Sequence, residues 1–338
     1  MDYRHREVIK KYSPTLQQSI NLHDMKDSLS ESKIFTAHML KDIYDGEASF
    51  FEELPTRGPQ AFFRFINLLK TNGYTTIAEE LCHVANPAYQ ISDNHGYHHI
   101  ILNYEFKGIK SSEELKELEC GYKLEASALD SALLQNDFKN HKYHVNLEAD
   151  KLYSKLKKFS KMDSLRGVNS CIVIILSFGT QIKDSKVIYG HNGKYILLHD
   201  ILNLFSDTNC PSLKYKPKIF ILPSFDVSHN VSVERVELST DVNDTFLWYL
   251  PPLKIYKCIN NVREIKFFGE ILSENLRANF HKSDFETVLK SSYSMFIGQL
   301  KEKEIPTADL NDIPECERLG YCREKILFTS SLERNQEC

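Results

Sequence analysis

Two short apolar runs, CIVIIL at Cys171–Leu176 and KIFIL at Lys218–Leu222, decide the fold of this chain. Both are continuous and rich in β-branched or aromatic residues, which is typical of strands buried on both faces of a parallel sheet. Further strand and helix patterns surround them: strands at His98–Asn103 and His144–Asn146, and helices at Leu124–Phe138, Leu147–Phe159 and Leu198–Phe205. Alternating strands and helices predict an α/β layered domain with a mostly parallel central sheet flanked by helices.

The residues before this region have a different pattern. Phe62, Phe65, Ile66 and Leu69 follow the spacing of one helix face, and Asn72-Gly73 ends that helix. Further helical windows precede them, and strand-like alternation is missing. This block therefore predicts a small all-α bundle of five or six helices, followed by a linker rich in Pro, Ser, Asp, Asn and Gly at 86–96.

Composition excludes several classes of protein. The chain has 338 residues, 42% hydrophobic and 26% charged, which excludes wholesale disorder. Its longest apolar run has six residues, against the ~20 needed to span a bilayer, and its first residues show no secretory signal. The net charge of −4 lacks the basic excess that suggests a nucleic-acid or membrane partner. We expect a cytoplasmic protein with reduced cysteines.

A metal site is not predicted. His95, His98 and His99 lead into an apolar strand, and Cys316 and Cys322 have no second ligand pair nearby. No cofactor motif is present either. Chemistry is instead expected beyond the carboxyl ends of the strands, at Ser177-Phe178-Gly179 and Pro223-Ser224-Phe225.

At those strand ends the sequence resembles the caspase family. CIVIILSFG at 171–179 is similar to the family's strand ending in Ser-His-Gly, and NCPSL at 209–213 with KPKIF at 216–220 is similar to its CPSL…KPK run. The segment REKILF at 323–328 resembles the closing strand of the small subunit. Residues 53–62, ELPTRGPQAF, resemble part of a caspase-recruitment domain of the death fold.

The resemblance implies an order of domains like that of an initiator caspase. Residues 1–90 would form the recruitment domain and residues 97–226 the large-subunit region. Residues 227–244 would form the intersubunit linker and residues 245–332 the small-subunit region.

The same resemblance implies that the catalytic residues are lost. The family's catalytic His position falls on Phe178, and the position of its nucleophilic Cys falls on Phe225. The Gln and two Arg that hold a substrate aspartate fall on Pro223, Glu119 and Ile259, with Ile259 expected in a strand. Gly179 is retained at the oxyanion-hole position. We expect Phe178 and Phe225 to pack against each other in the former cleft.

Two features of the resemblance concern processing and assembly. Asp241 and Asp244 lie where the family is cut between its subunits, so cleavage there is one interpretation and simple solvation the other. The strand Lys325-Ile326-Leu327-Phe328-Thr329 is expected at a sheet edge, where it would pair with its own copy or with a caspase. The alternative is a strand that only completes its own sheet.

The first hypothesis is a catalytically inactive caspase-like protein that regulates apoptosis. It would bind a recruitment-domain adaptor or an initiator caspase, through charges such as Arg57, Arg64, Asp24, Asp27 and Glu31, and would pair or compete with active caspases. The alternative is an active cysteine endopeptidase with a displaced site, using Cys210 or Cys258, or a Ser224–His229 pair. A third option is a recruitment module with a decaying C-terminal domain.

Overall fold

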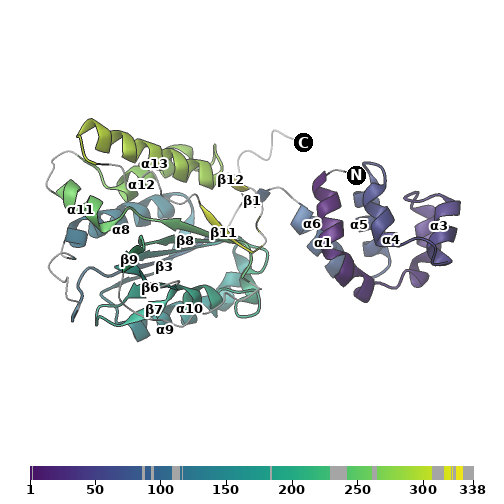
Figure 1. Ribbon diagram of the computed structural model, residues 1–338, viewed down its shortest axis with the longest axis horizontal. Helices are drawn as coiled ribbons and strands as arrows, with labels where there is room; N and C mark the ends of the chain where they lie inside the picture. The colour runs from purple at the N-terminus through teal and green to yellow at the C-terminus, as the bar shows by residue number, and fades with distance from the viewer. Residues whose placement is uncertain are drawn as a thin grey trace. The chain divides into compact units, whose positions relative to one another are not determined.

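The computed structural model describes residues 1, 3–85, 88–92, 95–108, 115, 117–182, 185–228, 242–260, 265–306, 316–320, 322 and 325–329. The chain divides into two units, residues 1–87 and 88–338, each with its own core (Figure 1). The boundary falls within the linker predicted from the cluster of turn-forming residues.

The first unit consists of α-helices. Its six helices are α1 (Tyr3–Ser19), α2 (Lys26–Glu31), α3 (Ala37–Tyr44), α4 (Phe50–Glu53), α5 (Ala61–Thr71) and α6 (Thr75–Ala85). Phe62, Phe65 and Leu69 are buried on the predicted face of α5. Helix α1 contains Pro14. A helical bundle is therefore observed, as the pattern predicted.

The second unit is built on a six-stranded sheet in the order β11-β10-β8-β4-β2-β3. The strands are β2 (Gly96–Leu102), β3 (Phe138–Val145), β4 (Cys171–Leu176), β8 (Lys218–Leu222), β10 (Thr245–Tyr249) and β11 (Glu317–Leu319). All neighbours pair in parallel except β10 and β11. This confirms the predicted mostly parallel sheet, with Cys171–Leu176 and Lys218–Leu222 next to each other at its centre.

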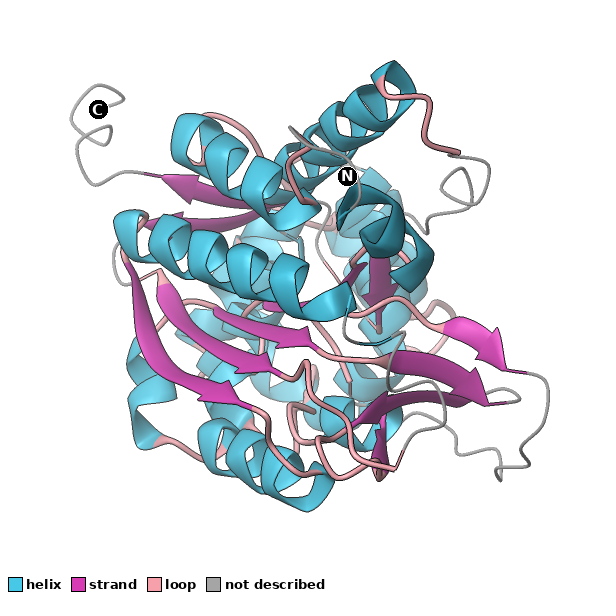
Figure 2. Cartoon of the chain, turned by 90° about the vertical axis from the view of Figure 1, so that its left-hand side faces the viewer, coloured by secondary structure: helices cyan, strands magenta, loops and turns pink. Residues whose placement is uncertain are grey.

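Helices cover both faces of this sheet (Figure 2). The helices are α8 (Glu117–Gln135), α9 (Ala149–Ser160), α10 (Leu198–Asn203), α11 (Leu253–Asn260), α12 (Phe268–Asn279) and α13 (Phe285–Glu302). Ile172 and Ile174 of β4 share a hydrophobic cluster with α8, α12 and α13. Cys171 and Val173 share a second cluster with α9 and α10. Alternate side chains of one strand thus supply both halves of the core.

The largest differences between observed and predicted element boundaries concern α8 and β3. The helix expected over Leu124–Phe138 runs over Glu117–Gln135 instead. It ends because Asp137 adopts a φ of 61°, in the left-handed region, and turns the chain into β3. Phe138 then begins β3 and is buried against the rings of Phe280 and Phe328.

Two smaller sheets complete the second unit. One has the order β7-β6-β5-β9, from β5 (Gly179–Ile182), β6 (Ser185–Tyr189), β7 (Tyr195–Leu197) and β9 (Asp226–Ser228). The other pairs β1 (Ala88–Ser92) in parallel with β12 (Lys325–Thr329).

The strand predicted at Lys325–Thr329 is observed as β12, in a separate two-stranded sheet and not in the main sheet. The antiparallel strand at the edge of the main sheet is β11, whereas β12 pairs within the chain with β1. Ile326 and Phe328 of β12 are buried in the core, and the Phe328 ring stacks on Phe280 at 4.5 Å. Alternate side chains of β12 are thus held in the core, and the strand completes a sheet within its own unit.

We expect Phe328→Ala to destabilise the second unit by about 3–5 kcal/mol, because it removes a buried ring and leaves a cavity. Urea denaturation followed by tryptophan fluorescence would measure this, since Trp248 is buried in the same cluster. Leu327→Ala is the matched control: Leu327 is half-buried on the other face of β12 and should cost about 1 kcal/mol. Equal small losses would contradict the packing of β12.

Candidate active site

The carboxyl ends of β4 and β8 bring the two predicted segments together. β4 ends at Leu176, directly before Phe178 and Gly179, and β8 ends at Leu222, directly before Pro223. A Cβ atom on Gly179 would lie 2.7 Å from the Ser224 carbonyl oxygen and 3.0 Å from Pro223 Cγ. The segments therefore cross in direct contact.

This crossing accounts for Gly179. Any side chain there would overlap the backbone of Ser224, so the position needs glycine whether or not an oxyanion is bound. Beyond the crossing the two segments continue together, since β9 pairs in parallel with β5 from Thr180 to Ile182. The retained glycine is thus explained by packing alone.

The rings of Phe178 and Phe225 occupy different surroundings, so their predicted mutual packing is wrong. Phe178 stacks on Tyr189 at a centroid distance of 5.3 Å and packs beside the cluster of α8 and α12. Phe225 meets Tyr249 edge-on at 5.7 Å and packs beside the cluster of α9 and α10. The cause is that the backbone after β4 points Phe178 toward one face of the sheet, while the backbone after β8 points Phe225 toward the other face.

The positions expected to grip a substrate carboxylate are of the wrong kind. Glu119 lies on α8, is half-exposed, and pairs with Lys123 at 2.6 Å. Ile259 lies on α11, a helix instead of the expected strand, and is buried in the core. Pro223 packs against Gly179. None of these three side chains offers a positive charge to an incoming aspartate.

Helix α11 is one of the elements that the sequence analysis did not predict. Its residues Ile255, Tyr256 and Ile259 are buried, a helical spacing that directly follows Pro251-Pro252 and was available in the sequence. Tyr256 packs edge-on against Tyr122 at 5.1 Å. The Tyr122 hydroxyl in turn donates to the Ser177 carbonyl at 3.1 Å.

A buried carboxyl group links α11 to two other helices. Glu125 of α8 accepts a hydrogen bond from the Tyr256 hydroxyl at 2.7 Å and one from the Gly269 N–H of α12 at 2.9 Å. Burial raises the pKa of Glu125 to about 7, although both hydrogen bonds oppose the shift. The group therefore changes charge close to neutral pH inside the core.

The cysteines in the described part of the chain do not show the features of an activated thiol. Cys210 is buried, and burial raises the pKa of its thiol, as it does for Cys171. A nucleophilic cysteine needs the opposite shift. Cys258 lies half-buried on α11. For the proposed Ser224–His229 pair, His229 lies outside the described residues.

Of the two aspartates at which cleavage was considered, the structure describes Asp244 and not Asp241. Asp244 is only 3% exposed, and its carboxylate accepts a hydrogen bond from the buried Tyr89 hydroxyl at 2.5 Å. A peptidase needs an exposed, extended segment, so the prediction of processing at Asp244 in the folded chain is wrong. Asp241 lies outside the described residues.

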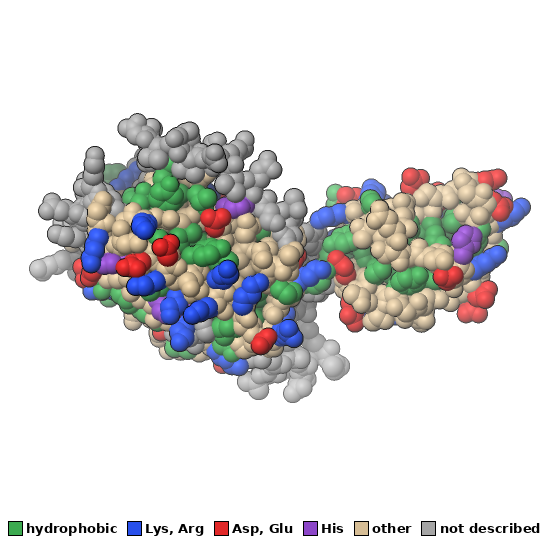
Figure 3. All heavy atoms as spheres, turned by 90° about the horizontal axis from the view of Figure 1, so that it is seen from below, with side chains coloured by type: hydrophobic (Ala, Val, Ile, Leu, Met, Phe, Trp, Pro, Cys, Tyr) green, Lys and Arg blue, Asp and Glu red, His purple; other side chains and the backbone are tan. Residues whose placement is uncertain are grey.

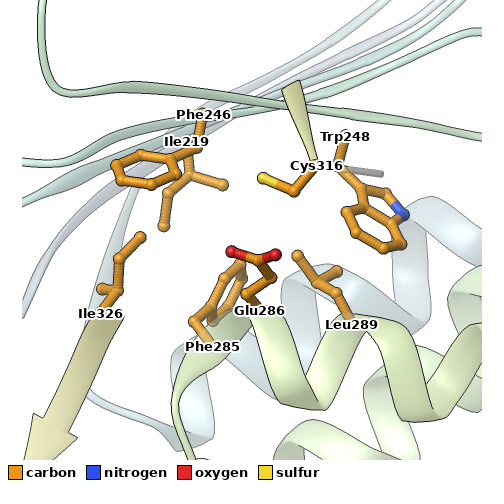
Figure 4. A pocket seen from close by; sticks show the side chains of 8 residues that line it. All are labelled: Ile219, Phe246, Trp248, Phe285, Glu286, Leu289, Cys316 and Ile326. Carbon is orange, nitrogen blue, oxygen red and sulfur yellow. The ribbon is translucent and has the colours of Figure 1, made fainter. Parts of the chain in front are cut away.

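Two hollows border the main sheet, and the second adjoins one strand end, because the Nζ of its Lys186 lies 5.8 Å from the centre of the Phe225 ring. Figure 4 shows a cavity between the sheet and α13, into which Glu286 and Cys316 point. The space in this cavity that a water molecule can occupy is about 10 Å³, room for at most one water molecule. A groove of about 340 Å³ lies beside the edge strand β11. Several leucines line it, together with Lys186 and Glu317, which form an ion pair at 3.0 Å. Among the described residues, no group of three or more acidic, His or Cys side chains is placed to hold a metal ion.

Comparison with known proteins identifies the class and then the family. The fold is shared with solved caspase structures: that of the Drosophila initiator caspase Dronc superimposes with a TM-score of 0.52 at 14% identity, over 71% of this chain and 85% of that one. The family model for the caspase domain matches residues 100–306. That match covers more than half of the sequence, and the chain belongs to the caspase family.

Curated relatives agree with this assignment. Chicken caspase-2 (Gallus gallus) is 27% identical over 295 residues, which is 66% of this chain and 66% of that protein. Human caspase-9 is 22% identical over 285 residues, 66% of this chain and 68% of that protein. The chain thus spans about two thirds of the length of these relatives. In the described residues no helix is long and apolar enough to cross a bilayer.

The Glu125 carboxyl group predicts a pH dependence of stability. Between pH 4.5 and about 7 the unfolded chain ionises Glu125 while the folded chain keeps the proton, so the free energy of unfolding should fall as pH rises. The full loss above pH 7 is roughly 3 kcal/mol.

Glu125→Gln removes this titration, so the difference in melting temperature between variant and parent should change across that interval. Thermal melts at several pH values measure it, and Glu119→Gln, a half-exposed carboxylate on the same helix, is the control. A difference that stays constant with pH would contradict the assignment.

Proposed function

We propose that this chain is a catalytically inactive member of the caspase family that regulates apoptosis, or a related signalling pathway, through binding. The observation that carries this proposal is the pair of phenylalanines at the carboxyl ends of β4 and β8. Phe178 and Phe225 occupy the positions that correspond to the family's general base and its nucleophile. A phenyl ring neither takes up a proton nor attacks a carbonyl, so both steps of acyl transfer lack a residue.

The surroundings of these rings support the same conclusion. The family grips a substrate aspartate with arginines, since guanidinium groups match a carboxylate in charge and geometry. Here Glu119 would repel that carboxylate, while Ile259 is buried on α11 and Pro223 covers Gly179. Loss of the pocket together with the reactive pair argues against a displaced catalytic site.

Binding is assigned to two separate surfaces. The first is the helical unit, whose charged residues suit a recruitment-domain adaptor or an initiator caspase: Arg64 on α5, and Asp27 and Glu31 on α2, are exposed on its surface. The second is the edge strand β11, which lies at the end of the main sheet, where a strand edge can pair with a strand of another molecule. A subunit bound there would occupy the partner site of an active caspase.

The domain order completes the proposal. Residues 1–90 serve as the recruitment domain, 97–226 and 245–332 as the large- and small-subunit regions, and 227–244 as the segment between them. The site of action is the cytoplasm. This assignment rests on the resemblance of the motifs and is supported by the separate cores of the two units.

We expect the purified protein to leave aspartate-containing peptides uncleaved, and the double variant Phe178→His with Phe225→Cys to do the same. The restored pair would still lack a carboxylate grip, and small errors in geometry between nucleophile and base abolish catalysis. Turnover of a fluorogenic aspartyl peptide measures this, with circular dichroism to show that the variant is folded. Strong aspartate-directed activity of the double variant would contradict the pocket assignment. Activity of the parent that disappears in Cys210→Ala or Cys258→Ala would establish the displaced site instead.

Deleting residues 1–87 should abolish co-precipitation of a recruitment-domain partner. In the full chain, Arg64→Glu should weaken capture by reversing one exposed charge of that unit, and Lys70→Glu is a matched charge reversal at the other end of the same helix. Capture that survives the deletion unchanged would disprove recruitment through the helical unit. It would leave the β11 edge as the binding surface, which an equilibrium sedimentation experiment with an active caspase would then test.

A further inference from the structure

Positive charge is concentrated in one segment of a chain that is negative overall. Residues 139–166 contain eight Lys or Arg and three Asp or Glu, whereas the whole chain has a net charge of −4. The net charge therefore hides a local basic region. Figure 3 views the side of the second unit that carries α9 and α10, and Lys and Arg predominate there over Asp and Glu.

Helix α9 presents most of this charge to solvent. Its inner side is apolar, with Leu152, Leu156 and Phe159 buried against the sheet. The lysines of α9, and Lys161 directly after its last residue, are all exposed: Lys151, Lys155, Lys157, Lys158 and Lys161. Of these, Lys151 pairs with Glu148 at 3.1 Å. Within the described part of the chain, Lys155, Lys157 and Lys158 form no ion pair, so their charge is available to a partner.

The edge strand β3 extends the same surface. Lys142 of β3 is exposed, and His144 lies two residues further along the same strand. Burial lowers the pKa of His144, and the positive charges of Lys155 and Lys142 lower it further. Lysines of α9 and of β3 thus both contribute positive potential at His144. We call the following residues the lysine face: Lys142, Lys151, Lys155, Lys157, Lys158 and Lys161.

We propose that the lysine face docks this protein on an anionic lipid bilayer. Clusters of four to eight basic residues on an amphipathic helix are the usual means of electrostatic attachment to such membranes. The face belongs to a helix that lies flat on the sheet, so its lysines reach a planar surface together. This revises the expectation of no membrane partner, which rested on the net charge alone.

The chemistry of the face favours a bilayer over a nucleic acid. Seven of the eight basic residues in 139–166 are lysines, which act as hydrated point charges, whereas arginine forks suit the geometry of individual phosphates. The aromatic residues of α9 are Phe159, which is buried, and Tyr153, which is half-buried, so α9 offers no exposed ring for stacking on bases. Asp150 and Asp163 flank the lysines and limit the attraction to a moderate, salt-sensitive one.

The test is sedimentation of the full chain with vesicles of phosphatidylcholine, with and without phosphatidylserine. We expect binding only to the phosphatidylserine vesicles, and loss of that binding at high NaCl. Each lysine should contribute about fivefold to the partition coefficient, so Lys155→Gln, Lys157→Gln and Lys158→Gln together should weaken it about 100-fold. Asp150→Asn with Asp163→Asn should strengthen it severalfold.

The matched control is Lys282→Gln, Lys301→Gln and Lys303→Gln. It removes the same total charge from exposed positions on the side of α12 and α13, which pack on the opposite face of the sheet. An equal loss in this control would overturn the proposal, because the effect would then come from the total charge. No binding of the parent at low salt would overturn it as well. So would binding of a duplex DNA oligonucleotide, followed by fluorescence anisotropy, at concentrations where vesicles are not bound.

Discussion

The second unit depends on one constraint: β4 must be buried on both faces at once. Its side chains Ile172 and Ile174 enter one hydrophobic cluster, and Cys171 and Val173 enter the other. Every helix layer is therefore fixed relative to this strand, and so is the point where its carboxyl end delivers Phe178 and Gly179. Since parallel strands end at the same edge, β8 delivers Ser224 to the same place. The crossing at Gly179 follows from the core.

That crossing shows how far packing alone fixes the framework at the strand ends. The strands, the glycine and the close backbone contact are demanded by packing, whatever the side chains at the strand ends do. The side chains at the strand ends have no such demand on them. Here they are apolar, and each ring packs beside the hydrophobic cluster on its own side of the sheet. The helix α11, with its buried hydrogen bond from Tyr256 to Glu125, adds further packing near the same edge.

Much of this was readable from the sequence, and the failures have physical reasons. Cys171–Leu176 and Lys218–Leu222 were predictable because a continuous apolar run carries its own burial signal. The positions of Phe178 and Phe225 followed from contiguous motifs. The partner of β12 was not predictable, since pairing with β1 depends on contacts between the two ends of the unit. The directions of the two phenyl rings, and the burial of Asp244 by Tyr89, likewise depend on tertiary contacts that no local pattern encodes.

The sheet order has a consequence for a chain cut between β9 and β10. The cut would place β8 and β10 in different fragments, and these two strands are hydrogen-bonded neighbours over five residue pairs. Both fragments would also share the cluster of α8, α12 and α13. A nicked chain would therefore remain a non-covalent complex of two fragments. Mixing separately produced pieces should regenerate the native unit, and a cleavage visible on a denaturing gel would leave the native particle intact.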